Sequence, residues 1–339
     1  ASDDGIRGKD KVIITKGKYT ITSTGDGIKA TNDKNTSKGY INISGGTYTI
    51  KSDGDGIQAE SYLNISGGTF NITTRGGYTT IIGSSVKAKG VKANTELNIK
   101  GGTFTFNTPD DAIHSNGNIT ISGGTIKVQT GDDGIHAEDT LTINGGNITI
   151  SNSKEGLEGS KIYFKNGTVN VKATDDGVNA APEGSDNNSG QNQAQSTGLI
   201  SISGGSLKVY SNGDALDSNG SIAISGGETF IESSNTRLET ALDHDKDMTV
   251  TGGTFIALYK SLGMNDSGTR TTSIPYVYAP VNNGSGKITI GNITYTPTLT
   301  GYKHIFIISS KLTNNTNYDL KYGNNLVSVT TKTGTISTS

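Results

Sequence analysis

The sequence predicts an all-β fold, a right-handed parallel β-helix of about ten coils, from three observations. A Ser-Gly-Gly-Thr string or a close variant recurs from Gly45-Gly46 to Gly252-Gly253, and an acidic-Gly-aliphatic marker recurs in phase with it. The repeat is about 22 residues long, and each copy holds three short runs of alternating apolar residues separated by turn formers. A repeat of this length without a helical period indicates one coil of three strands, in which equivalent positions stack about 4.8 Å apart.

The composition agrees with this fold and excludes several others. The 339 residues include 48 glycines but no glycine at every third position, and β-branched residues are plentiful, which excludes collagen and disorder. Cysteine is absent, so disulfides and thiolate metal sites are excluded. The formal net charge of −2 gives no overall attraction to nucleic acid or anionic membranes. No stretch is apolar enough for a membrane-spanning helix, and we expect a soluble monomer, either mature or cytosolic.

The repeat phase predicts which side chains point inward. One inward row is Tyr48, Phe70, Phe104, Ile126 and Ile148, and another is Ile41, Leu63, Leu97, Ile119 and Leu141. The repeat fails after about residue 258, where runs at 287–293, 303–308 and 325–330 are typical of antiparallel strands. We therefore expect a β-helix over 1–258 and a β-strand cap over 259–339 that covers the open end of the ladder.

Stacking gathers the acidic markers along one corner, because residues 22 apart in sequence become neighbours in space. Like charges about 5 Å apart repel by roughly 3 kcal/mol at an effective dielectric of 20. Lys154 is the cation counted in this corner, and it cannot balance eight carboxylates, which favours Ca²⁺ bound by oxygen ligands. Good turn chemistry for Asp-Gly stays the alternative explanation, above all at Asp26 and Asp55. The candidate metal ligands are Asp111, Asp132, Asp133, Glu155, Glu158, Asp175, Asp176, Asn179, Asp214, Asp217 and Asp243.

A row of outward side chains lies three residues after each marker. It changes from basic to acidic along the chain: Arg7, Lys29, Gln58, Lys92, His114, His136, Glu158, Asn179, Asp217 and Asp243. The candidate ligand-binding residues are His114, His136, Lys89, Lys92 and Tyr163. Insertions at 75–88 and 232–238 precede their markers and are expected to project from the acidic corner, whereas those at 31–39 and 182–198 project from the next corner.

The marker segments also resemble a known family. The segments Asp132-Asp133-Gly134-Ile135-His136-Ala137, Glu155-Gly156-Leu157-Glu158-Gly159 and Asp175-Asp176-Gly177-Val178-Asn179-Ala180, together with 301–310, are similar to those of bacterial carbohydrate-binding β-helix proteins. The coils of those proteins resemble the calcium-dependent family 9 polysaccharide (pectate) lyases, which use a Lys base. The resemblance implies secretion and cell-surface display with the signal peptide removed, Ca²⁺, and binding of cellulose or of polygalacturonate and pectin.

The choice between a binding protein and a lyase depends on which residues occupy the acidic corner. The lyases carry a third acid after Asp-Asp-Gly-x, where this chain has His136 or Asn179. Lys154 is the candidate base, but surrounding carboxylates favour the protonated form of a lysine, which cannot take up a proton. The sequence therefore favours a non-catalytic polysaccharide-binding protein, with a calcium-dependent lyase as the alternative.

Overall fold

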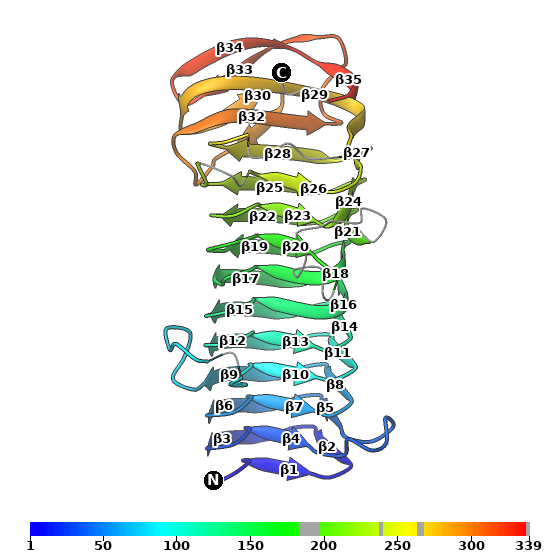
Figure 1. Cartoon of the computed structure of the whole chain (residues 1–339), viewed down its shortest axis with the longest axis vertical. Coiled ribbons are helices and arrows are strands. Elements are labelled where there is room, and N and C mark those ends of the chain that lie inside the picture. Colours follow the sequence, from blue (N-terminus) through cyan, green and yellow to red (C-terminus); the bar gives the residue numbers. More distant parts are fainter. Residues whose placement is uncertain (84, 183–196, 237–239, 263–267, 337–339) are drawn as a thin grey trace. The chain divides into compact units, whose positions relative to one another are not determined.

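The computed structural model describes residues 1–83, 85–182, 197–236, 240–262 and 268–336. The described chain is all-β and consists mainly of parallel strands, which confirms the predicted class (Figure 1). It divides into two compact units, residues 1–170 and 171–339, and each is described by itself. No helix in the described ranges is long and apolar enough to cross a membrane.

The first unit is built from three rows of parallel strands, in which each of the first thirteen strands pairs with its counterpart three strands further along the chain. The first row is β3 (Lys18–Ser23), β6 (Thr47–Ser52), β9 (Thr69–Thr74), β12 (Thr103–Thr108), β15 (Thr125–Thr130) and β17 (Asn147–Asn152). The second row is β1 (Ile6–Gly8), β4 (Ile28–Ala30), β7 (Ile57–Ala59), β10 (Val91–Ala93) and β13 (Ile113–Ser115). The third row is β2 (Lys11–Ile14), β5 (Tyr40–Ile43), β8 (Tyr62–Ile65), β11 (Glu96–Ile99) and β14 (Asn118–Ile121). The longer strands β16 (Ile135–Ile143) and β18 (Leu157–Phe164) continue the second and third rows together.

The inward rows have the predicted register. Tyr48 pairs with Phe70, Phe70 with Phe104, and Phe104 with Ile126, and all four side chains are buried. The rings of Tyr48, Phe70 and Phe104 stack 4.6 and 4.7 Å apart, as the strand spacing requires. The alternation of buried and exposed positions along each strand therefore produces a continuous apolar core.

The second glycine of each Gly-Gly marker has a structural reason. At Gly68 and Gly102 the angle φ is 118° and 110°, a region that side chains disfavour. These glycines turn the chain directly before the first-row strands β9 and β12.

The second unit begins with the same type of pairing. Strands β20 (Val178–Ala180), β23 (Leu216–Ser218) and β26 (Leu242–His244) form one parallel row. Two further rows are β21 (Gly198–Ile202), β24 (Gly220–Ile224) and β27 (Met248–Val250), and β22 (Ser206–Ser211), β25 (Glu228–Ser233) and β28 (Thr254–Tyr259). Strand β19 (Thr168–Lys172) crosses the boundary between the units.

Antiparallel pairing follows β28, as the sequence predicts. Strand β32 (Tyr302–Ser309) pairs antiparallel with β28 and with β29 (Arg270–Gly284), which also pairs with β35 (Lys332–Thr335). A second sheet contains β30 (Ile288–Ile290), β31 (Ile293–Tyr295), β33 (Asn317–Tyr322) and β34 (Asn325–Thr330). The domain boundary between residues 258 and 259 stays a prediction.

Three of the insertions lie partly outside the described residues. Most of the insertion at 182–198, the end of the insertion at 232–238 and residue 84 in the insertion at 75–88 fall there. Glu232 and Ser233, which were assigned to the second of these insertions, are instead the last residues of β25. They belong to the strand because the parallel pairing of β25 with β28 continues through both residues: Glu232 pairs with Leu258, and Ser233 pairs with Tyr259.

Candidate functional site

The marker carboxylates first of all connect successive coils. Asp4 Oδ1 accepts a hydrogen bond from the backbone N–H of Asp26 at 2.9 Å, and Asp26 Oδ1 accepts one from Asp55 at 2.7 Å. Asp55 Oδ1 in turn accepts one from Lys89 at 2.7 Å. The same bond is made to Asp111 and Asp133 in the first unit and to Asp176 and Asp214 in the second. One carboxylate oxygen of each of these seven aspartates therefore has a structural role that turn chemistry alone does not describe.

Lys89 stands at a marker position and is the cation at the centre of the acidic corner. Its side chain is buried, with Nζ 2.6 Å from Asp110 Oδ1 and 2.5 Å from Asp111 Oδ2. Burial alone would lower the pKa of Lys89, but the charges of Asp111 and Asp110 outweigh it and raise the pKa above its usual value. The corner therefore contains a second lysine beside Lys154, and the ligand-binding role predicted for Lys89 stays a prediction.

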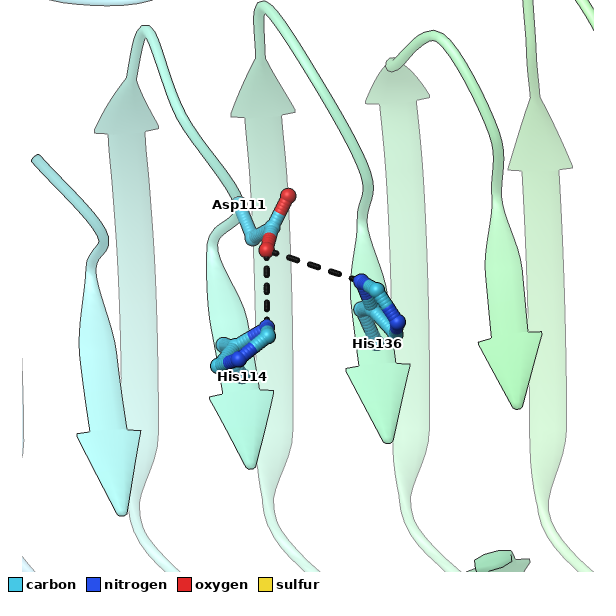
Figure 2. A group of neighbouring side chains, drawn as sticks. All are labelled: Asp111, His114 and His136. Carbon is cyan, nitrogen blue, oxygen red and sulfur yellow. Dashed lines mark ion pairs between the residues drawn. The ribbon is translucent and has the colours of Figure 1, made fainter. Parts of the chain in front are cut away.

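Two histidines face Asp111 from neighbouring strands (Figure 2). His114 on β13 places Nδ1 2.9 Å from Asp111 Oδ2, and His136 on β16 places Nδ1 3.8 Å from the same oxygen. Burial by itself lowers the pKa of His136, but the nearby carboxylates of Asp111, Asp133 and Glu158 outweigh burial and raise this pKa to about 11. The pKa of Asp111 lies well below its usual value, because these histidines and Lys89 outweigh the effect of burial. His136 is therefore cationic at neutral pH.

The acidic side of the corner continues from His136 to Glu158. His136 Nδ1 lies 3.2 Å from Glu158 Oε2 and 3.5 Å from Asp133 Oδ2. Burial and the charge of Asp133 raise the pKa of Glu158 to about 9. Burial and the charges of Asp133 and Asp111 raise the pKa of Asp132 to about 6. Both carboxyl groups hold their protons more tightly than usual, so an added cation near them would be favourable.

Three overlapping groups of side chains bring their possible ligand atoms within 4.8 Å of one another. We call these residues together the acidic cluster: the groups are Asp111, His114 and His136; Asp133, His136 and Glu158; and Asp110, Asp111 and Asp132. The third group offers only carboxylate oxygens, which are the ligands that Ca²⁺ prefers, whereas imidazole suits transition metals better. The Glu138 carboxylate lies 3.9 Å from the Nε2 atoms of both His114 and His136. Neither Glu138 nor Asp110 was among the site residues predicted from the sequence.

The remaining predicted residues lie around this cluster or in the other unit. Glu155 contributes its backbone N–H to Asp133, and its carboxylate lies 3.6 Å from the exposed Lys154. Tyr163 lies on β18 in the third row, with Lys165 Nζ 5.7 Å from its ring centroid. In the second unit Asp217 pairs in register with Asn179 and Asp243, and Asp214 bonds to Asp176. Asp175 is also in that unit, where its carbonyl accepts the Gly213 N–H at 3.0 Å.

The outward row has the predicted order within each unit. In the first unit Arg7, Lys29, Gln58, Lys92, His114, His136 and Glu158 are consecutive partners in the second-row ladder. Lys29 Nζ is 2.6 Å from Asp26, whereas Lys92 Nζ makes no hydrogen bond or ion pair with any residue in the described ranges. Lys92 is therefore a cation of this row that can reach an external anion.

A pH-dependent stability follows from the buried carboxyl group of Asp55. Burial and the charge of Asp26 raise its pKa from 3.8 to about 6. Because the folded-state pKa is the higher one, this group favours the folded state below pH 3.8, and the contribution is lost as the pH rises through about 6. At 1.36 kcal/mol for each pH unit, the loss is about 3 kcal/mol.

Asp55→Asn keeps the oxygen that accepts the Lys89 N–H and cannot ionise. We expect the variant to be more stable than the wild type at pH 7, by up to about 3 kcal/mol, and the difference to vanish near pH 4. Urea denaturation at both pH values measures this, with the exposed Asp53→Asn as the matched control. An unchanged or lower stability of Asp55→Asn at pH 7 contradicts the assignment.

The comparisons with known proteins agree with a carbohydrate-binding class. A family model described as "Carbohydrate-binding domain-containing protein" matches this all-β chain over residues 1–134 and 132–338. The chain belongs to this family. No curated protein and no solved structure matched it.

Proposed function

We propose that this chain is an extracellular, calcium-dependent protein that binds plant cell-wall polysaccharide, built as a right-handed parallel β-helix. Membership of a carbohydrate-binding family supports polysaccharide as the ligand. The regular parallel pairing of each strand in a row with the equivalent strand of the next coil supports the β-helix. The observation that carries the calcium is the carboxylate-only group of Asp110, Asp111 and Asp132.

Asp132 is the residue on which a cation would act most directly. Asp110 and Asp111 already pair with Lys89, whereas the Asp132 carboxylate makes no hydrogen bond or ion pair with a described residue. Its raised pKa comes from burial and from neighbouring negative charge, and a divalent cation would offset the second of these causes. We propose that Asp132 holds Ca²⁺ together with Asp110 and Asp111, and that water or ligand oxygens complete the six to eight that Ca²⁺ takes.

The second-row ladder supplies the proposed contact surface for an acidic glycan. Its side chains repeat about every 4.8 Å, which suits an extended chain with repeating units. Lys92 is the neighbour in this ladder of His114, which belongs to the acidic cluster. We propose that uronate carboxylates of polygalacturonate bind Lys92 and share the Ca²⁺ held by the cluster. Cellulose, the other polysaccharide that the sequence suggests, carries no such anion.

A calcium titration tests the metal site. Isothermal titration calorimetry of the metal-free protein with CaCl₂ is expected to show binding that Asp132→Asn weakens at least about tenfold, because one ionised ligand is lost. Asp139→Asn, an exposed acid on the same coil, is the control and is expected to bind as the wild type does. Absence of calcium binding, or equal affinity of both variants, contradicts the proposed site.

The lyase alternative has a direct assay. Lys154 is half-exposed at the corner, and its Nζ lies 3.6 Å from Glu155. We expect no unsaturated product when the protein is incubated with polygalacturonate and Ca²⁺ and the ultraviolet absorbance is followed. A steady increase that Lys154→Ala abolishes would establish catalysis instead.

A further inference from the structure

A shallow groove of about 260 Å³ lies on the third row of strands, apart from the acidic cluster. It is lined by residues of β2, β5 and β8 and of the turns after β5, β8 and β11, among them Ile13, Asn42, Ser44, Asn64, Ser66 and Lys100. Ile13 is 54% exposed, which is unusual for a large apolar side chain in this unit. The groove offers amides, hydroxyls, an aliphatic surface and one lysine, but no carboxylate.

The asparagines of this groove form an ordered ladder. Asn64 Nδ2 donates to Asn42 Oδ1 at 2.9 Å, and Asn98 Nδ2 donates to Asn64 Oδ1 at 3.0 Å. These bonds fix the orientation of all three amides before any ligand arrives. Asn42 keeps both of its N–H groups for an external partner, and Asn64 keeps one N–H and one carbonyl lone pair. Asn98 Nδ2 also donates to Glu96 Oε1 at 3.0 Å, so Asn98 offers its carbonyl oxygen. The ladder therefore presents alternating donors and acceptors at the strand spacing of about 4.8 Å.

Two tyrosines extend the ladder along the same face. Tyr40 and Tyr62 each precede a ladder asparagine by two residues, so the side chains lie on the same side of β5 and β8. Their rings stack 4.7 Å apart at an interplanar angle of 6°, and both residues are partly exposed. The mutual stacking covers ring faces and leaves edges and hydroxyl groups toward solvent, where they can bond to sugar hydroxyls.

We propose that this amide face, formed by Tyr40, Asn42, Tyr62, Asn64 and Asn98 beside Ile13, binds an uncharged polysaccharide chain. Hydroxyl groups are both donors and acceptors, so they match amides of fixed orientation. The aliphatic Ile13 suits the apolar C–H surface of a sugar ring. The proposal rests on the proposed polysaccharide binding, but it needs neither Ca²⁺ nor the acidic cluster.

Calorimetric titration with cellohexaose, in the presence of a chelator, tests the amide face. Asn64→Ala removes both bonds of the ladder, and Asn42→Ala removes its end. We expect each variant to lose about tenfold or more in affinity for cellohexaose, while oligogalacturonate binding in Ca²⁺ is unchanged. Asn71→Ala on the first row is the matched control, because Asn71 is an exposed asparagine of β9 that points away from this face.

The outcomes separate this inference from the proposed function. Equal cellohexaose affinity of Asn42→Ala and the wild type overturns the amide face. Binding of oligogalacturonate but not of cellohexaose by the wild type also overturns it and leaves the proposed function standing. Binding of neither oligosaccharide overturns both. The melting temperature of each variant shows whether a loss of cellohexaose affinity is caused by unfolding. If Asn64→Ala unfolds, the affinity of Asn42→Ala, which removes only the end of the ladder, decides whether the amide face binds the sugar.

Discussion

Replacing Lys89 by methionine is expected to lower the free energy of unfolding by about 3–5 kcal/mol. Methionine preserves the length and most of the volume of the lysine side chain, so the loss of charge is the main change. Asp110 and Asp111 are buried, and each has an oxygen within 2.6 Å of Lys89 Nζ. Removing the ammonium group of Lys89 leaves the Asp110 and Asp111 carboxylates buried next to each other without their compensating cation.

Urea denaturation at pH 7 with a chelator present measures this effect. Lys92→Met is the matched control, because Lys92 lies three residues away on the same corner and has no ion pair within the described ranges. Its expected change is within about 0.5 kcal/mol. Adding Asp110→Asn to Lys89→Met should restore part of the lost stability, because the residual repulsion falls. A Lys89→Met protein as stable as Lys92→Met would show that Lys89 does not compensate the corner.

Replacing Glu232 by alanine is expected to cost a similar amount, about 3–5 kcal/mol. Glu232 on β25 is fully buried and accepts hydrogen bonds from the Tyr295 hydroxyl and from the backbone N–H groups of Thr298 and Leu299. Phe230 stacks on Tyr295 at 4.5 Å beside it. The substitution therefore leaves two buried donors, the Tyr295 hydroxyl and the Leu299 N–H, and the more exposed Thr298 N–H without their acceptor, and it opens a cavity under residues 295–299.

The control for this substitution lies on the same strand. Glu228 makes an ion pair with Lys311 at 2.9 Å, but both side chains are 49% exposed. Exposed ion pairs contribute about 0–1 kcal/mol, so Glu228→Ala should change stability little. Thermal denaturation and protease sensitivity of the segment at 295–299 distinguish the two variants. Equal behaviour of Glu232→Ala and Glu228→Ala contradicts the anchoring role of Glu232.

The strand rows could be predicted because the repeat carries two independent periods. The alternation of apolar residues, with a period of two, determines which side chains point inward. The spacing of the markers determines which of these side chains become partners on neighbouring strands. Leu63 and Leu97 are partners although they lie 34 residues apart, since an insertion does not change the position within the coil. The same logic placed His114 beside His136.

The electrostatics of the corner could not be predicted in the same way. A marker position is occupied by Lys89, and the sequence does not say whether its ammonium group points to solvent or to Asp110 and Asp111. The hydrogen bonds that backbone N–H groups of the next coil donate to the marker carboxylates depend on side-chain rotamers, which the repeat spacing does not specify. Burial of Glu232 depends on residues 63–67 positions further along the chain, so no local pattern could indicate it.

The central claim is calcium-dependent binding of an acidic polysaccharide, and one titration tests it most directly. Soluble oligogalacturonate is titrated into the purified protein, first in CaCl₂ and then in chelator, with calorimetric detection. We predict saturable binding in Ca²⁺ that weakens at least about tenfold in chelator, because the shared cation is removed. Equal affinity with and without Ca²⁺, or no binding in either condition, would contradict the claim.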